Sequence, residues 1–136
     1  MIKLTPGQIA DTIAKKATKF YQEALGVGPR ETRVYIVEDM IIVRTKGRLL
    51  LIEQALIKNK QIELVKNIRQ VFHEITTPKL GRMISEITSH KVISSHSDIS
   101  TKTGERTEVF VLDTDYETEL KDFNKHFSAK ETVETT

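Results

Sequence analysis

The segment HSDISTKTGER, from His96 to Arg106, holds the side chains of this sequence that are best suited to chemistry. If residues 92–100 form one strand, His96 and Asp98 share a face with Val92, because side chains alternate between the two faces of a strand. A carboxylate at this spacing can orient an imidazole for proton transfer or share a metal ion with it. The same pair can also serve only as hydrogen-bonding groups along a sheet edge.

The second half of this segment has the composition of a short hairpin turn. Gly104 suits the positive φ that such turns require, and the neighbouring hydroxyls can satisfy free backbone amides. The amides, with Lys102 and Arg106, could equally hold a small anion. The residues that we predict to bind a ligand or a partner are His96, Asp98, Ser100, Thr101, Lys102, Thr103, Gly104 and Arg106.

An enzymatic role for this segment is an alternative hypothesis. His96 would act as general base, oriented by Asp98, while Lys102 or Arg106 held an anionic substrate. This hypothesis requires a pocket that brings the four side chains within hydrogen-bonding reach. The sequence shows no nucleophile elbow, no dinucleotide-binding fingerprint and no cysteine, so we predict no catalytic residues, no metal and no cofactor.

Basic residues gather around the stretch VRTKGR and form a second candidate patch, which comprises Arg33, Arg44, Lys46 and Arg48. Such a patch can bind nucleic acid. The element order is similar to that of the bacterial type of KH domain, which grips RNA with a GXXG loop between paired helices. The corresponding junction here, IKNKQ, contains no glycine, and no aromatic residues alternate with the basic ones. We therefore do not expect a nucleic-acid partner.

The elements expected from periodicity and turn residues follow the order α-β-β-α-α-β-β. Thr5, Pro6 and Gln8 predict the start of a helix over 6–25, and Gly26 its end. RVYIV and MIIVRT form a hairpin around Glu38-Asp39, and LLLIEQALIKN is a short helix. From Gln61 a helical face continues past Pro78, which favours one long, kinked helix over two helices. KVISSHSDIS and RTEVFVLD are the last two strands, so the fold class is α+β with an antiparallel sheet packed against helices.

Three of these strands are apolar on both faces, at VYIV, MIIV and VFVL. A sheet with one solvated face should alternate between apolar and polar residues. Helices can cover one face, and a second copy of the chain is the simplest cover for the other. We predict a homodimer. The alternative is that the first helix and the tail cover the second face within one chain.

Length and composition predict a single domain over residues 1–113, followed by a polar, partly disordered tail over 114–136. The chain has 136 residues and a net charge of +2. Its longest apolar runs are much shorter than a membrane span, and the first residues do not read as a secretion signal. We expect a cytoplasmic protein that could lie at the membrane only through a partner.

Three stretches together resemble the MpsC-like family of small bacterial and archaeal proteins: TRVYIVEDMIIVRTKGRL, TPKLGRMISEITSHKV and SSHSDISTKTGERTEVFVLD. The resemblance covers Gln8 to Asp113 and is most specific within the His96–Arg106 segment. The family takes its name from a Na⁺-translocating system that generates membrane potential, with links to inorganic-carbon transport. It implies an accessory or regulatory role beside a membrane transport complex, with no agreed reaction or cofactor.

Overall fold

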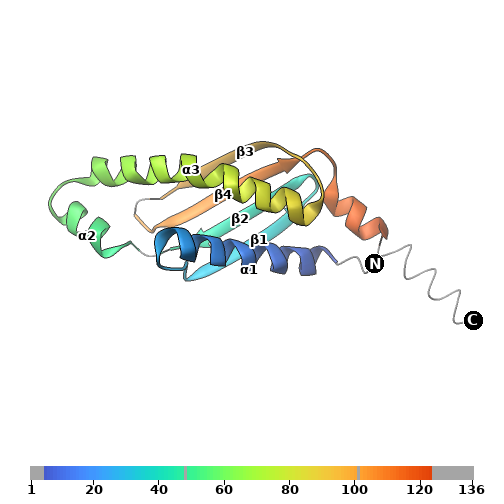
Figure 1. Ribbon diagram of the computed structural model, residues 1–136, viewed down its shortest axis with the longest axis horizontal. Helices are drawn as coiled ribbons and strands as arrows, with labels where there is room; N and C mark the ends of the chain where they lie inside the picture. Colours follow the sequence, from blue (N-terminus) through green and yellow to red (C-terminus); the bar gives the residue numbers. More distant parts are fainter. Residues whose placement is uncertain (1–4, 48, 101, 124–136) are drawn as a thin grey trace, which may run out of the picture.

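The computed structural model describes residues 5–47, 49–100 and 102–123. Figure 1 shows the two longer helices lying along the length of a four-stranded sheet. The α+β fold class and the order of elements are as the sequence predicts. The elements are α1 (Pro6–Leu25), β1 (Glu31–Val37), β2 (Met40–Lys46), α2 (Leu51–Lys58), α3 (Ile62–Thr88), β3 (Val92–Ile99) and β4 (Glu105–Leu112).

Local signals set the bounds of α1. The Thr5 hydroxyl accepts a hydrogen bond from the Gln8 amide, and the Gln8 side chain accepts one from the Thr5 amide. This capping box satisfies two of the amides that a helix start leaves free. Gly26 ends the helix with a φ of 79°, a left-handed conformation that glycine adopts without strain.

α3 is one continuous helix from Ile62 to Thr88, with Pro78 inside it. The structure thus agrees with the prediction of one long helix. Pro78 has no amide hydrogen to donate to the carbonyl of Glu74, so α3 carries a gap in its hydrogen-bond ladder. Tertiary contacts compensate, because Leu80 and Ile84, in the turns that follow, are fully buried.

The sheet is antiparallel, in the order β1-β2-β4-β3. The last of the described strands, β4, therefore lies between β2 and β3, where it joins the two hairpins into one sheet. Residues of β2 and β4 alternate strictly, so that one face carries the buried side chains Ile41, Val43, Phe110 and Leu112.

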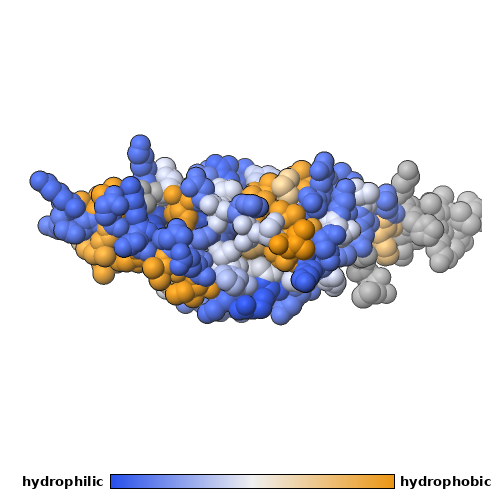
Figure 2. All heavy atoms as spheres, turned by 90° about the horizontal axis from the view of Figure 1, so that it is seen from above, coloured by the Kyte–Doolittle hydropathy of each residue, from blue (hydrophilic) through white to orange (hydrophobic). Residues whose placement is uncertain are grey.

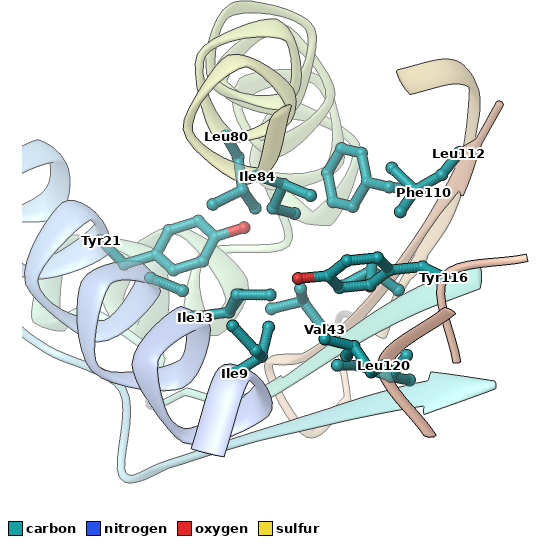
Figure 3. Packing of buried hydrophobic residues seen from close by; sticks show 13 residues of the cluster. Ile9, Ile13, Tyr21, Val43, Leu80, Ile84, Phe110, Leu112, Tyr116 and Leu120 are labelled. Atoms are coloured by element: carbon teal, nitrogen blue, oxygen red, sulfur yellow. The ribbon is translucent and has the colours of Figure 1, made fainter. Parts of the chain in front are cut away.

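The core lies between this buried face and the helices α1 and α3. Figure 3 shows Ile9 and Ile13 of α1 and Leu80 of α3 converging on Phe110 and its neighbours. Gly81 faces the Phe110 ring, and a Cβ added there would lie 3.5 Å from it, at ordinary van der Waals distance.

The segment after β4 contributes to the same core. Residues 116–123 are helical, and Tyr116 and Leu120 are buried in the cluster shown in Figure 3. His90 ties this helix to the end of α3, since its Nε2 lies 2.6 Å from the Glu119 carboxylate. The predicted polar tail covers 114–136, and residues 124–136 of it lie outside the described residues.

One predicted strand face is wrong. Val92 pairs with Leu112 and packs on the core, whereas Ser94 pairs with Val111 on the other face. A β-bulge between Val92 and Ser94 inserts one extra residue and shifts the alternation. Val92 is therefore not on the face of His96 and Asp98.

Candidate functional site: a pocket around two buried arginines

A pocket of about 150 Å³ opens where α1, α2, α3 and one end of the sheet meet. Its walls are largely apolar and include Leu25, Val27, Leu56, Ile68 and Phe72. Its polar groups come from five elements: Tyr21 of α1, Glu53 of α2, Arg69 of α3, Thr45 of β2 and Arg106 of β4. Apolar walls with a few convergent polar groups are typical of small-molecule sites.

Arg69 and Glu53 form a bidentate ion pair that joins α3 to α2. Arg69 Nε donates to Glu53 Oε2 at 2.6 Å, and Arg69 Nη2 donates to Oε1 at 3.0 Å. Both side chains are about nine-tenths buried. Burial pushes the pKa of Glu53 upward, but the hydrogen bonds from Arg69 and the Leu50 amide outweigh it, so that this pKa lies below its ordinary value. Glu53 is therefore ionised at neutral pH and holds α2 over the pocket.

Arg106 lies between two aromatic rings at the base of the pocket. Its guanidinium carbon is 5.1 Å from the centre of the Tyr21 ring and 5.3 Å from that of Phe72, so both rings contact the cation. The residue is only 9% exposed. Among the described residues, its buried Nε has no hydrogen-bond partner. A buried donor without a partner is costly, so this guanidinium, which lines the pocket, has unused hydrogen-bonding capacity.

Glu108 lies two residues beyond Arg106 on the same face of β4 and is almost fully buried. The Tyr21 hydroxyl donates to Glu108 Oε2, and the Thr77 hydroxyl donates to Oε1 at 2.7 Å. Burial, together with the neighbouring Glu108 carboxylate, raises the pKa of Tyr21 far above its usual range, although Arg106 opposes the shift. Tyr21 therefore remains a neutral donor that fixes the wall of the pocket.

His73 connects this buried carboxylate to the surface. Its Nδ1 lies 3.3 Å from Glu108 Oε1, and its Nε2 shares a hydrogen bond with the Ser97 hydroxyl. The order serine, imidazole, carboxylate is that of a nucleophilic triad. Ser97, however, lies within a regular strand, and Thr77 contacts both the imidazole and the carboxylate. We interpret the chain of bonds as structural support for Glu108.

The structure separates the residues predicted to form a site in the His96–Arg106 segment. His96 pairs with Val109 and Asp98 with Thr107, so both lie on the sheet face away from the helices. Arg106 belongs to the opposite, buried face. The pocket required by the general-base hypothesis is therefore not formed, because the strand register places base and cation on different sides of the sheet.

The backbone amides in the turn of this segment already donate hydrogen bonds within the turn. The amides of Thr103, Gly104 and Glu105 donate to Ser100 Oγ, the Ser100 carbonyl and Thr103 Oγ1, respectively. Gly104 has a φ of 75°, as the turn requires. These amides are thus not free to hold an anion, and Lys102 is exposed beside them. Thr101 lies outside the described residues.

The predicted basic patch is neutralised within the sheet. Arg33 pairs with Glu31, Arg44 with Glu105, and Lys46 lies 3.6 Å from Glu31. Cations that already have carboxylate partners have less attraction to offer a phosphate backbone. Arg48 is outside the described residues.

Sequence reasoning selected Arg106 but missed Tyr21, Glu53 and Arg69. One feature of the sequence could have indicated the pocket. The stretch RTEVFVL places Arg106 and Glu108 on the same strand face as Phe110 and Leu112. Two charges that share a face with core residues indicate a buried polar site. Within the described residues, no group of three or more histidine, aspartate or glutamate side chains is arranged to hold a metal ion.

Comparison with known proteins identifies the family. Residues 5–114 match the family described as the Na⁺-translocating membrane potential-generating system (MpsC). The chain belongs to this family. The uncharacterized protein YbcI of Bacillus subtilis (strain 168) is 36% identical over 121 residues, which are 88% of this chain and 98% of YbcI. No solved structure matches the chain. Over the described ranges, none of the helices has the length and hydropathy needed to cross a membrane.

Proposed function

We propose that this MpsC protein is an accessory, ligand-binding component of a Na⁺-translocating membrane system, and that its pocket takes a small organic anion. The family description supports the link to the membrane system. The observation that carries the binding role is Arg106, buried between two rings at the pocket base with an unpaired Nε.

The pocket also restricts the class of ligand. A cavity of about 150 Å³ with aliphatic and aromatic walls is comparable to one that accommodates benzene, which has six heavy atoms. The carboxylate of the ligand would accept from Arg106, while its body displaced water from Leu56 and Phe72. Arg69 is already paired with Glu53, so the pocket has one cation to offer and favours a monoanion over a dianion.

The test uses benzoate as the probe and benzyl alcohol as an uncharged aromatic analogue of similar size. Calorimetric titration of the full chain should give at least tenfold tighter binding of benzoate, because a charge-assisted hydrogen bond contributes about 1.5–3 kcal/mol. Arg106→Met should remove this preference. Lys102→Met, which removes an exposed cation of the same hairpin outside the pocket, should leave it unchanged.

Equal binding of the two probes, or no binding of either, would contradict the proposal. If Arg106→Met does not fold, NMR of the wild-type protein can test whether Arg106 binds the carboxylate. The Arg106 Nε–H resonance should then shift with benzoate and remain in place with benzyl alcohol.

A further inference from the structure

The sheet has a second face that no described helix covers. Its side chains alternate with the buried ones, and they include Tyr35 and Val37, each about 40% exposed. Its middle is apolar and half-buried, and consists of Met40, Ile42, Val109 and Val111. We refer to these residues, with the charged rows described next, as the open face. An exposed apolar patch of this kind marks an interaction site.

Charges on the open face are confined to one end of the sheet. The register places Arg33, Arg44, Thr107 and Asp98 in one row across the four strands. In the next row outward, Glu31, Lys46 and Glu105 lie side by side. The rows toward the other end contain Tyr35-Ile42-Val109-His96 and Val37-Met40-Val111-Ser94. In the Arg33 row, the two arginines thus lie on β1 and β2, and the aspartate, Asp98, lies on β3.

This pattern is self-complementary for one choice of two-fold axis. If the axis runs parallel to the strands, between β2 and β4, each row faces the same row of the second copy with its order reversed. Arg33 and Lys46, which both lie beside Glu31 of their own chain, then face the partner's Asp98 and the partner's Glu105 as additional carboxylates. Ile42 faces the partner's Val109, so apolar side chains meet apolar ones.

The other in-plane axis, perpendicular to the strands, gives a poor match. It would place the charged Arg33 row against the apolar rows from the other end of the sheet, so the ion pairs Arg33–Glu31 and Arg44–Glu105 would be buried against apolar side chains. Burying an ion pair costs desolvation energy that apolar neighbours do not repay. The charge pattern therefore selects one dimer geometry.

We infer that the chain forms a two-fold symmetric homodimer through its open face, with the strands of the two sheets stacked and Arg33 of each copy facing Asp98 of the other. Face-to-face sheets typically pack about 10 Å apart with their strands aligned to within about 30°. This inference concerns the opposite side of the sheet from the pocket, so it is independent of the proposed function.

The size of the face sets the expected affinity. Seven-residue strands about 24 Å long, in a sheet about 19 Å wide, give roughly 450 Å² of flat area per copy. Standard interfaces bury about 800 Å² of accessible surface per partner. The dimer is therefore expected to bind more weakly than complexes with a standard interface. Its dissociation must be followed over a range of protein concentrations.

The test is a charge swap, measured by sedimentation velocity of the full chain from 1 to 200 µM. Arg33→Asp or Asp98→Arg alone places like charges opposite each other at both symmetric positions and should weaken the dimer at least tenfold. The combined variant, Arg33→Asp with Asp98→Arg, should restore most of the affinity. Both side chains are exposed, so folding should be unaffected.

Arg82→Asp, an exposed change on α3 away from the sheet, is the matched control and should leave the dimer unchanged. A monomer at every concentration would overturn the inference. A dimer whose affinity is unchanged by both single substitutions would also overturn the inference. It would indicate an interface at the exposed stripe on α3 formed by Leu64, Ile68, Val71 and Ile75.

Discussion

The short helix α2 should depend on a single buried ion pair. α2 has eight residues, all of them described, and Glu53 is the one that is buried. A helix of this length is not stable alone in water. Its attachment to the protein therefore relies on the two hydrogen bonds from Arg69 and on partial contacts of Leu56.

Glu53→Gln keeps the shape of the side chain but removes its charge, which leaves the Arg69 cation without a counter-charge. Removal of one partner from a buried pair costs about 3–5 kcal/mol when the structure stays closed. Here α2 can swing away and let water reach Arg69, which limits the loss in global stability. The cost should then appear as opening of α2, and about 3 kcal/mol corresponds to a roughly hundredfold higher open population.

Hydrogen–deuterium exchange measured by mass spectrometry can separate these two outcomes. In Glu53→Gln the hydrogen-bonded amides of α2, from Gln54 to Lys58, should exchange about a hundred times faster, while those of α1 and β4 change much less. The matched control is Glu63→Gln, whose carboxylate lies 3.6 Å from Lys66 with its side chain 85% exposed. An exposed pair contributes about 0–1 kcal/mol, so this control should behave like wild type.

Two results would refute this reasoning. One is unchanged exchange in α2 together with unchanged stability in urea. The other comes from the double variant Glu53→Leu with Arg69→Met, which removes both charges and should cost less than the two single changes added together. A double variant with fully additive losses would show that the pair does not couple α2 to α3.

Acid pH and Pro78 give two further predictions. Because the folded protein holds the pKa of Glu53 below its ordinary value of 4.5, the contribution of Glu53 to stability is complete above that pH and is lost as pH falls through the lower folded value. Urea unfolding at pH 5 and pH 3 should therefore show a smaller acid-induced loss for Glu53→Gln than for wild type, and an equal loss would exclude this linkage. Pro78→Ala restores the missing amide donor within α3 and should raise the free energy of unfolding by about 1–3 kcal/mol, as measured by the urea midpoint. A lower midpoint would mean that packing of α3 requires the proline.

Much of the fold follows from local signals that act over a few residues. The capping box at Thr5 and Gln8 and the glycine at position 26 define α1, and Glu38-Asp39 defines the first hairpin. The predicted continuity of α3 through Pro78 also held, because the apolar face continues on both sides of the proline. Such signals are readable because caps and turns depend on residues that are adjacent in the chain.

Two features could not be predicted from local signals: the sheet face on which Val92 lies, and the pocket. A β-bulge is set by how two distant strands pair, so the sequence of β3 alone did not reveal it. Tyr21, Glu53 and Arg69 resemble surface residues of amphipathic helices, and only the meeting of three helices with the sheet buries them. Their burial is a property of tertiary structure rather than of spacing.

The position of β4 between β2 and β3 has a consequence for biosynthesis. Met40 pairs with Val111 and Lys46 with Glu105, so the first hairpin gains its inner neighbour only when the last strand is made. An isolated hairpin is marginal in water, and α1 has no finished sheet to lie on until then. The nascent chain should therefore stay unfolded on the ribosome until Leu112 has emerged, after which both hairpins and the pocket form together as one cooperative unit.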